Sequence, residues 1–256
     1  AAPRGDDAPA ATGTDDGAAY DSAYDSAGRA ARFTDACATT DFHELVRLPQ
    51  KRFVHLMDFS AGVGGGDGAT PCWIRRALRL DATRRCARWY VGMWNERRMN
   101  MYTTSLFENA STSIDGYAGI RDVHIGLDVG GPAGTPVYAP WNGTIYAFGY
   151  NEAPGDYGHV VVTEHSIGGV TAWFLYGHLD ASSVAFKRVG QFVKRGERVG
   201  ALGAPHENGG WAPHVHFQVG LVRPATHDMP GVVAVADRAR SLEEYPDPRL
   251  VVGALY

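Results

Sequence analysis

A histidine and an aspartate four positions apart, His124 and Asp128, stand in the sequence RDVHIGLDVGG at residues 121–131. The valines and the isoleucine around them favour a strand, and the glycines disfavour a helix. On a straight strand, four residues span about 13 Å, which is too far for both side chains to hold one ion at ligand distances of about 2 Å. The pair is therefore either unrelated or brought together by a bend at Gly126.

A second pair of imidazoles, His214 and His216, occurs in the sequence PHVHF, and His178 ends the run LYGHL. On a strand, residues two apart point to the same face about 6.7 Å apart. Neighbouring imidazoles must each find a hydrogen-bond partner and repel one another when both are charged, and a metal ion resolves both problems. With His124 and Asp128 they form a suitable supply for a catalytic zinc, which takes three protein ligands and keeps one position open. Satisfied surface histidines are the alternative, and spacing alone does not separate His214 from His216.

The remaining histidines lack a partner of this kind, and we expect them to be hydrogen-bonded or surface residues. They are His43, His55, His159, His165, His206 and His227.

The elements that must position these residues look like short strands. Between residues 116 and 222, runs rich in Val, Tyr, Phe and Ile alternate with Gly and Pro turn signals. The runs are VYAP, GTIYAFG, GHVVVTEH, TAWFLYGHL, GQFVKRGERVGAL and HVHFQVGLV. This pattern predicts a mainly β fold, a compact antiparallel sandwich or partly open barrel.

The character of the sequence divides the chain into four parts. Residues 1–32, rich in Ala, Asp and Gly, are expected to be a disordered tail because they offer little apolar surface to bury. Residues 33–115 are expected to form a helix-containing region packed on the β segment at 116–223, and residues 224–256 a strap or connector.

Within the second part, FVHLMDFS at 53–60 is a plausible strand. The stretch from Cys72 to Arg98 has the apolar spacing of an amphipathic helix, whose arginines we interpret as a solvated face.

Composition limits the remaining possibilities. With 256 residues, 45% of them hydrophobic, and a net charge of −4, the chain can bury one sizeable core, with room for a smaller appendage. It has no basic block for nucleic acid and no apolar run long enough to span a bilayer. No secretory signal is expected at its start, and because it begins at Ala1 it can be a processed or excised piece. Cys37, Cys72 and Cys86 allow one disulfide at most, and their pairing is left open.

Four stretches together resemble the lysostaphin/LytM-type zinc endopeptidases, in family order over about 120–222. They are HIGLDVGGPAGTPVYAPWNGTIYAFG, GDYGHVVVTEHSIGGVTAWFLYGHL, RVGQFVKRGERVGALG and GGWAPHVHFQV. The resemblance implies that His124, Asp128 and His216 bind one zinc ion per chain, and that His178 and His214 are the catalytic pair. It also implies a compact, mostly antiparallel β structure with a groove over the metal.

The sequence departs from the family pattern beside the site. Ala212 and Gln218 in WAPHVHFQ replace the usual Gly and Glu, which affects the shape of the groove and the contacts behind the ligands. The segments MDFS, NERRMNMYTTSLFE and DPRLVVGALY are similar to flanks of peptidase-like domains within larger chains. Those chains also carry kinase-like phosphotransferase and pyridoxal-phosphate aminotransferase regions.

The resemblance therefore predicts that the β segment at 116–223 is a zinc metalloendopeptidase domain that cleaves peptide bonds, with peptidoglycan cross-links as the substrate by family analogy. A monomer, or a module of a larger chain, is expected, without a nucleic-acid or membrane partner. The compartment is the cell envelope by analogy, or the cytoplasm if the chain is a module of a larger enzyme.

Two alternatives are weaker. A non-catalytic binding module of the same fold is disfavoured because all five site positions are intact. The segment PAGTPVYAPWNGTI also resembles the glucose-specific carrier of the bacterial phosphotransferase system, but such carriers do not need Asp128.

Loops at 149–158 and 204–213 are candidates for the walls of a substrate groove. Within the second, Trp211 either faces that groove or packs on the core.

Overall fold

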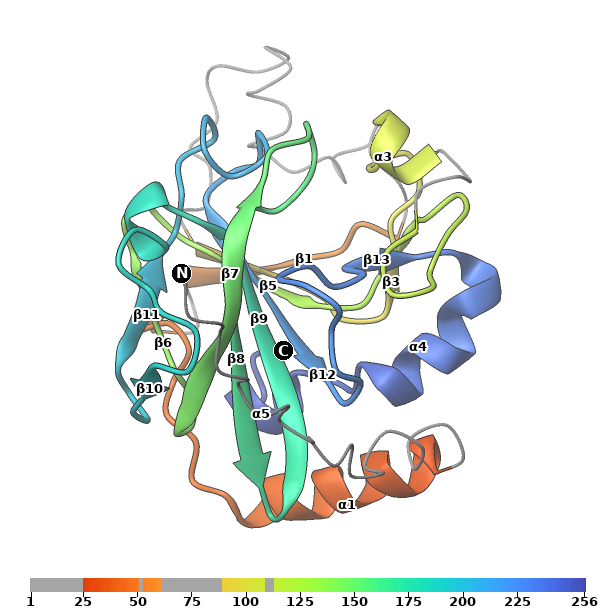
Figure 1. Cartoon of the computed structure of the whole chain (residues 1–256). Helices are drawn as coiled ribbons and strands as arrows, with labels where there is room; N and C mark the ends of the chain where they lie inside the picture. Colours follow the sequence, from red (N-terminus) through yellow and green to blue (C-terminus); the bar gives the residue numbers. More distant parts are fainter. Residues whose placement is uncertain (1–24, 51–52, 61–88, 109–112) are drawn as a thin grey trace, which may run out of the picture.

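The computed structural model describes residues 25–50, 53–60, 89–108 and 113–256, and its centre is an eight-stranded sheet (Figure 1). All neighbouring strands in this sheet are antiparallel except the edge pair β1 and β2, which is parallel. In spatial order, the strands are β1 (Val54–Met57), β2 (Trp89–Gly92), β5 (Leu127–Gly130), β12 (His214–Gly220), β9 (Val170–Leu179), β8 (Gly158–Ile167), β7 (Gly143–Asn151) and β10 (Phe192–Val193).

Two smaller sheets accompany the main one. One pairs β11 (Arg198–Ala201) with β6 (Pro136–Tyr138), and the other has the order β13 (Val232–Val233), β4 (Val123–His124) and β3 (Glu96–Arg97). The predicted mainly β fold is confirmed, and the main sheet stays open. The predicted strand at 53–60 is also present as β1.

The central strands of the main sheet, β5, β12, β9 and β8, are buried on both faces, which explains their long apolar runs. On β9, Phe174 and Tyr176 join one core cluster while Trp173 and Leu175 join the other, as the alternation of a strand requires. The first cluster also includes residues of α1 (Ser26–Thr39) and α5 (Arg249–Val252). The second includes Tyr245, which follows α4 (Arg238–Glu244).

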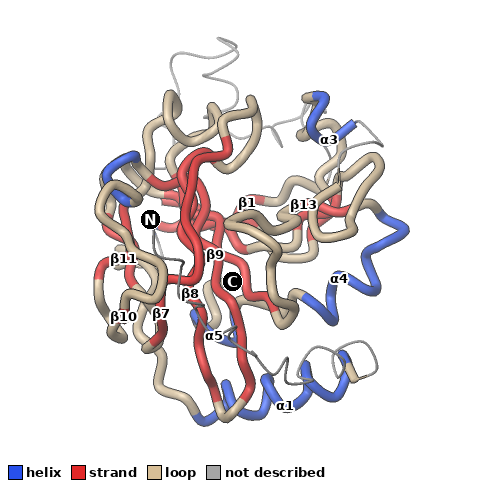
Figure 2. Tube along the Cα trace, in the orientation of Figure 1, coloured by secondary structure: helices blue, strands red, loops and turns tan. Residues whose placement is uncertain are grey.

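The helices lie at the periphery of the sheet. In Figure 2, α1 and α4 lie at one end of the molecule, and α1 contacts the β8–β9 hairpin. The remaining elements are single turns: α3 (Ser105–Glu108), η2 (Ala181–Ser183) and η3 (Val235–Asp237). Among the residues that the structure describes, each helix is too short or too polar to cross a bilayer.

Helix α1 corrects the predicted extent of the N-terminal tail. It begins at Ser26, inside the range expected to be disordered, and its Phe33 and Cys37 are buried in the core. Phe33 and Cys37 are four residues apart and therefore share one face of the helix, so this alanine-rich helix packs on the core through these two side chains. The rest of the expected tail, residues 1–24, lies outside the described residues.

The helix predicted from Cys72 to Arg98 is wrong over its C-terminal part. Residues 89–97 form β2 and β3, because the β-formers Trp89, Tyr90 and Val91 find pairing partners in β5 and β1. Residues 72–88 lie outside the described residues. The interpretation of the arginines as a solvated face also fails at Arg98, which is only 2% exposed.

The C-terminal segment 224–256, predicted as a strap or connector, also contributes a strand and buried side chains to the fold. Strand β13 pairs with β4, and Tyr245 and Val251 are buried. Cys37 is a buried free thiol, and the other two cysteines lie outside the described residues.

Candidate metal centre

His124 and Asp128 converge because the chain changes sheets between them. His124 ends β4 in the small sheet and Asp128 lies on β5 in the main sheet, and Ile125 and Gly126 connect the two strands. The Nε2 atom of His124 lies 3.2 Å from Oδ1 of Asp128. A Cβ atom at Gly126 would lie 2.2 Å from the imidazole of His216, so only glycine fits at this bend.

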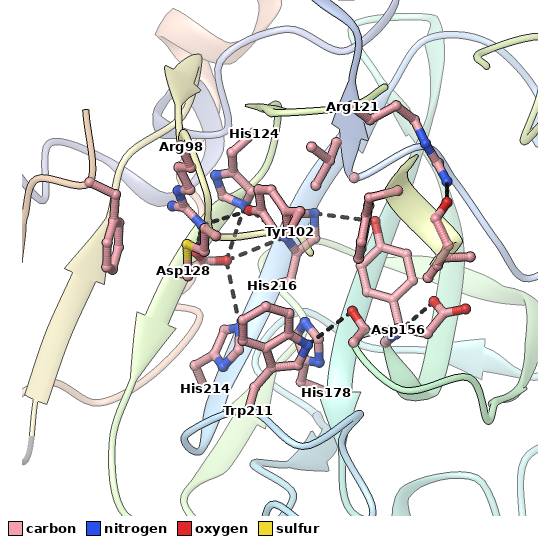
Figure 3. A pocket seen from close by; sticks show the side chains of 18 of the residues that line it. Arg98, Tyr102, Arg121, His124, Asp128, Asp156, His178, Trp211, His214 and His216 are labelled. Carbon is pink, nitrogen blue, oxygen red and sulfur yellow. Dashed lines mark hydrogen bonds and ion pairs between the residues drawn. The ribbon is translucent and has the colours of Figure 1, made fainter. Parts of the chain in front are cut away.

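His216 joins the pair through strand register. It lies opposite Asp128 in the β12–β5 ladder. Its Nδ1 atom lies 3.3 Å from Oδ1 of Asp128 and 3.0 Å from Nε2 of His124 (Figure 3). All three residues are buried, and each offers one possible ligand atom within 4.8 Å of the others.

The hydrogen bonds behind these residues fix which atoms face one another. Nδ1 of His124 donates to the carbonyl of Met93 (2.8 Å), and Nε2 of His216 donates to Oε1 of Gln218 (3.0 Å). The two facing ring nitrogens therefore carry lone pairs. Oδ1 of Asp128 faces them and has no hydrogen-bond donor.

Three acceptor atoms directed at one another are stable only with a proton or a cation between them. Their separations of 3.0 to 3.3 Å are close to the about 3.3 Å expected between ligands of a tetrahedral zinc ion. The residues therefore fit a metal ion in both chemistry and spacing.

Electrostatics favour the same protonation states. Burial, and then the charge of Arg98, lowers the pKa of His124 to about 4. Burial alone would raise the pKa of Asp128, but its close contact with the His124 ring and the charge of Arg98 hold it well below its usual range. The site thus presents a carboxylate and a neutral imidazole near neutral pH.

His178 and His214 lie together beside this cluster, with ring centroids 4.2 Å apart (Figure 3). Nδ1 of His178 donates to the carbonyl of Asn208 (2.9 Å), and Nδ1 of His214 donates to that of Ala212 (2.7 Å). Each Nε2 atom therefore keeps its lone pair, and that of His214 lies 3.8 Å from Oδ1 of Asp128. Burial lowers the pKa of both histidines, so they are neutral.

The backbone of His178 departs from regular strand geometry. In a regular strand His178 would point to the same face as Tyr176, away from the site. It adopts a φ of +60°, which is uncommon for a residue with a side chain, and its ring lies beside His214 instead. Such strained positions occur mostly at functional sites.

The five residues line a cavity of about 60 Å³, which has room for a few water molecules. Trp211 and Tyr102 also line it, with their rings 6.0 Å apart. Gly155 and Trp211, one from each loop predicted as a groove wall, both line this cavity, and the indole Nε1 of Trp211 donates to the carbonyl of Gly155 (3.0 Å). Trp211 therefore faces the site.

Sequence reasoning missed Glu96, Arg98 and Tyr102. Nη1 of Arg98 donates to Oδ2 of Asp128 (2.8 Å) and to the hydroxyl of Tyr102 (3.1 Å). The β-forming run WYVG just before these residues was the available signal that they belong to the sheet and not to a helix.

Residues 122–227 match the model of peptidase family M23. This segment, 106 of the 256 residues, is therefore similar to the M23 peptidases. The resemblance to lysostaphin/LytM-type peptidases over about 120–222 is thereby confirmed. The M23 segment holds all five site residues predicted from the sequence, whereas Glu96, Arg98 and Tyr102 lie outside it.

The chain is also similar to parts of larger proteins. Over 104 residues the chain is 36% identical to the cell division protein DipM of Caulobacter vibrioides, covering 41% of this chain and 15% of DipM. Over 121 residues it is 31% identical to the peptidoglycan DD-endopeptidase ShyC of Vibrio cholerae, covering 46% of this chain and 25% of ShyC. The chain thus spans a quarter or less of these two relatives.

Among solved structures, the chain is similar to the catalytic domain of the antimicrobial peptidase lysostaphin from Staphylococcus simulans. The TM-score is 0.35 at 23% identity, and the match covers 58% of this chain and 89% of that domain.

Proposed function

We propose that this chain is a zinc-dependent metalloendopeptidase in which His124, Asp128 and His216 hold one zinc ion. One observation supports this most: the buried Oδ1 of Asp128 has no hydrogen-bond donor and faces two imidazole lone pairs. A buried carboxylate oxygen without a donor is costly unless a cation occupies the site.

A zinc ion bound there supplies Lewis acidity, which lowers the pKa of water and polarises a peptide carbonyl. His214 then acts as the general base, since its Nε2 atom is unprotonated and closest to Asp128 among the two remaining histidines. His178 orients the attacking water through its own Nε2 or, once protonated there, stabilises the developing oxyanion. The carbonyls of Asn208 and Ala212 hold both rings in the required orientation.

The proposed substrate is a peptide, with peptidoglycan-type cross-links as the first candidate because ShyC is named as a peptidoglycan DD-endopeptidase. A cavity of about 60 Å³ is smaller than the several hundred Å³ typical of ligand pockets. A cavity of this size has no room for a whole peptide, so most of a bound peptide would lie outside it. We further propose a monomer acting in the cell envelope, with a module of a larger intracellular enzyme as the alternative.

Metal analysis of the purified chain tests the proposal, together with cleavage of peptidoglycan-type peptides. We expect about one zinc per chain in the wild type, and loss of zinc and activity in Asp128→Ala and His216→Ala, each of which removes a proposed ligand. His165→Ala is the matched control, because His165 is an equally buried histidine on β8 that bonds to the carbonyl of Asn142. Full zinc occupancy in Asp128→Ala would contradict the proposed site.

A further inference from the structure

Two charged side chains behind the proposed metal site have no role in the chemistry described so far. The side chains of Glu96 and Arg98 are only 3% and 2% exposed. Nε of Arg98 donates to Oε2 of Glu96 (2.8 Å), and its Nη1 donates to Oδ2 of Asp128 (2.8 Å). Buried charges are costly, and a buried ion pair adds little stability compared with apolar residues, so its presence calls for another explanation.

We propose that Glu96 and Arg98 are positioning residues that orient Asp128 for zinc, an inference that rests on the proposed function. Arg98 occupies Oδ2 of Asp128 and leaves Oδ1 directed at His124 and His216. A carboxylate held in this way offers the metal one oxygen. Without Arg98 the group can rotate and offer both.

Glu96 has a separate electrostatic role. A guanidinium bonded to one oxygen of Asp128 would repel a dication bound at the other oxygen. The carboxylate of Glu96 offsets this charge, so Glu96, Arg98 and Asp128 together carry one net negative charge, as a cation site requires. The other oxygen of Glu96, Oε1, accepts a hydrogen bond from the backbone of Phe59 (2.6 Å), which fixes the group in place.

The backbone just before Glu96, at residues 92 and 93, leaves room for the ion pair between Arg98 and Asp128. Gly92 lies opposite Asp128 in the β2–β5 ladder. A Cβ atom there would lie 2.8 Å from Oδ2 of Asp128 and 2.7 Å from Nη2 of Arg98, so a side chain would displace the ion pair. The next carbonyl, that of Met93, accepts from both His124 and Arg98. Residues outside the M23 segment thus support two of the three proposed ligands.

The test is the zinc affinity of the full chain, measured by competition with a chelator, in Arg98→Met and Glu96→Gln. Losing a residue that orients a ligand typically weakens metal binding about 10- to 100-fold, and we expect a loss in this range for both variants. Arg97→Met is the matched control, because the neighbouring Arg97 has an exposed side chain and pairs with Asp122 instead. Its affinity should equal that of the wild type.

Two further measurements separate positioning from a general effect on folding. In the double variant the two losses should not add, since Glu96 acts largely by offsetting the charge of Arg98. With Co²⁺ in place of zinc, Arg98→Met should show weaker visible absorption than the wild type, because a second carboxylate oxygen raises the coordination number from tetrahedral. If Arg98→Met does not fold, the zinc affinity and the Co²⁺ absorption are measured instead in Glu96→Gln and in the conservative variant Arg98→Lys.

The outcomes distinguish this inference from the proposed function. A wild-type chain that binds no zinc contradicts the proposed function itself. A wild-type chain that binds zinc, with unchanged affinity and an unchanged Co²⁺ spectrum in folded Arg98→Met and Glu96→Gln, overturns only the positioning role.

Discussion

At the scale of single residues, hydrogen bonds to the backbone determine which nitrogen of each imidazole faces the site. His124, His178 and His214 each donate Nδ1–H to a main-chain carbonyl and keep Nε2 free. His216 is the exception, since Gln218 takes its Nε2–H and leaves Nδ1 free. Gln218 stands where the family pattern has Glu, and here its amide oxygen accepts the hydrogen bond that orients His216.

The two histidines assigned to acid–base chemistry give a prediction at this scale. His178→Ala and His214→Ala should each lower kcat by about 10²- to 10⁴-fold, the usual contribution of a general acid or base. Both variants should retain zinc, because neither removes a proposed ligand. Metal analysis and peptide cleavage measured on the same samples check this.

A reversed pattern would reassign the two strand histidines. If His214→Ala loses zinc while His216→Ala keeps it, then His214 is the ligand and His216 the base.

At the scale of secondary-structure elements, strand register and one bend assemble the site. The β5–β12 ladder sets His216 opposite Asp128, and the β3–β4 ladder sets Glu96 opposite His124. The change of sheet at Gly126 then brings β4 against the main sheet. Each of these placements depends on pairing between segments far apart in the chain.

Gly126→Ala should therefore weaken zinc binding by more than about 10-fold, because the added methyl group would overlap the imidazole of His216. Chelator competition measures the affinity, and the melting temperature of the metal-free chain reports on folding.

Gly190→Ala is the control for this substitution. Gly190 has a φ of +79° and no atom within 4 Å of an added Cβ, so alanine there should cost about 1 kcal/mol of stability without affecting zinc. Equal zinc affinities in the two variants would show that the bend at Gly126 does not hold His216 in place.

At the scale of the whole molecule, the buried histidine His165, which lies outside the proposed metal site, makes the stability of the fold depend on pH. His165 on β8 is 2% exposed, and its Nδ1 donates to the carbonyl of Asn142. Burial lowers its pKa from 6.5 to about 4, so it stays neutral in the folded chain.

This shift predicts a loss of stability on acidification. Between pH 6.5 and pH 4 the unfolded chain binds a proton at His165 that the folded chain does not, so the free energy of unfolding falls as the pH falls. The contribution is fully present above pH 6.5 and decreases by about 2 kcal/mol by pH 5.

Urea unfolding of the wild type and His165→Gln at pH 7.5 and pH 5 measures this effect at equal zinc concentration. The wild type should lose more stability between the two pH values than the variant does. Equal losses in the two proteins would mean that His165 does not contribute.

The sequence alone indicated the strands of the β segment, and its resemblance to the lysostaphin/LytM-type peptidases singled out the five residues that the structure brings together. Period-two apolar runs between glycine and proline turns are a local signal, and the histidines and the aspartate occur in a recognisable order. Both can be read without knowing which strand pairs with which. The tail predicted for residues 1–32 is wrong over residues 26–32, which belong to α1, and the helix predicted for 72–98 is wrong at β2. In both places a weak local pattern was outweighed by tertiary packing or strand pairing.

Only the tertiary structure decided how the site is oriented and what supports it. Alternation along β9 would point His178 away from the site, and only its positive φ turns it back. Arg98 looks solvated in the sequence because its two carboxylate partners come from β3 and β5, and Asp128 is 30 residues away. A long-range ion pair depends on which strands become neighbours, and that is set by the burial of the whole sheet.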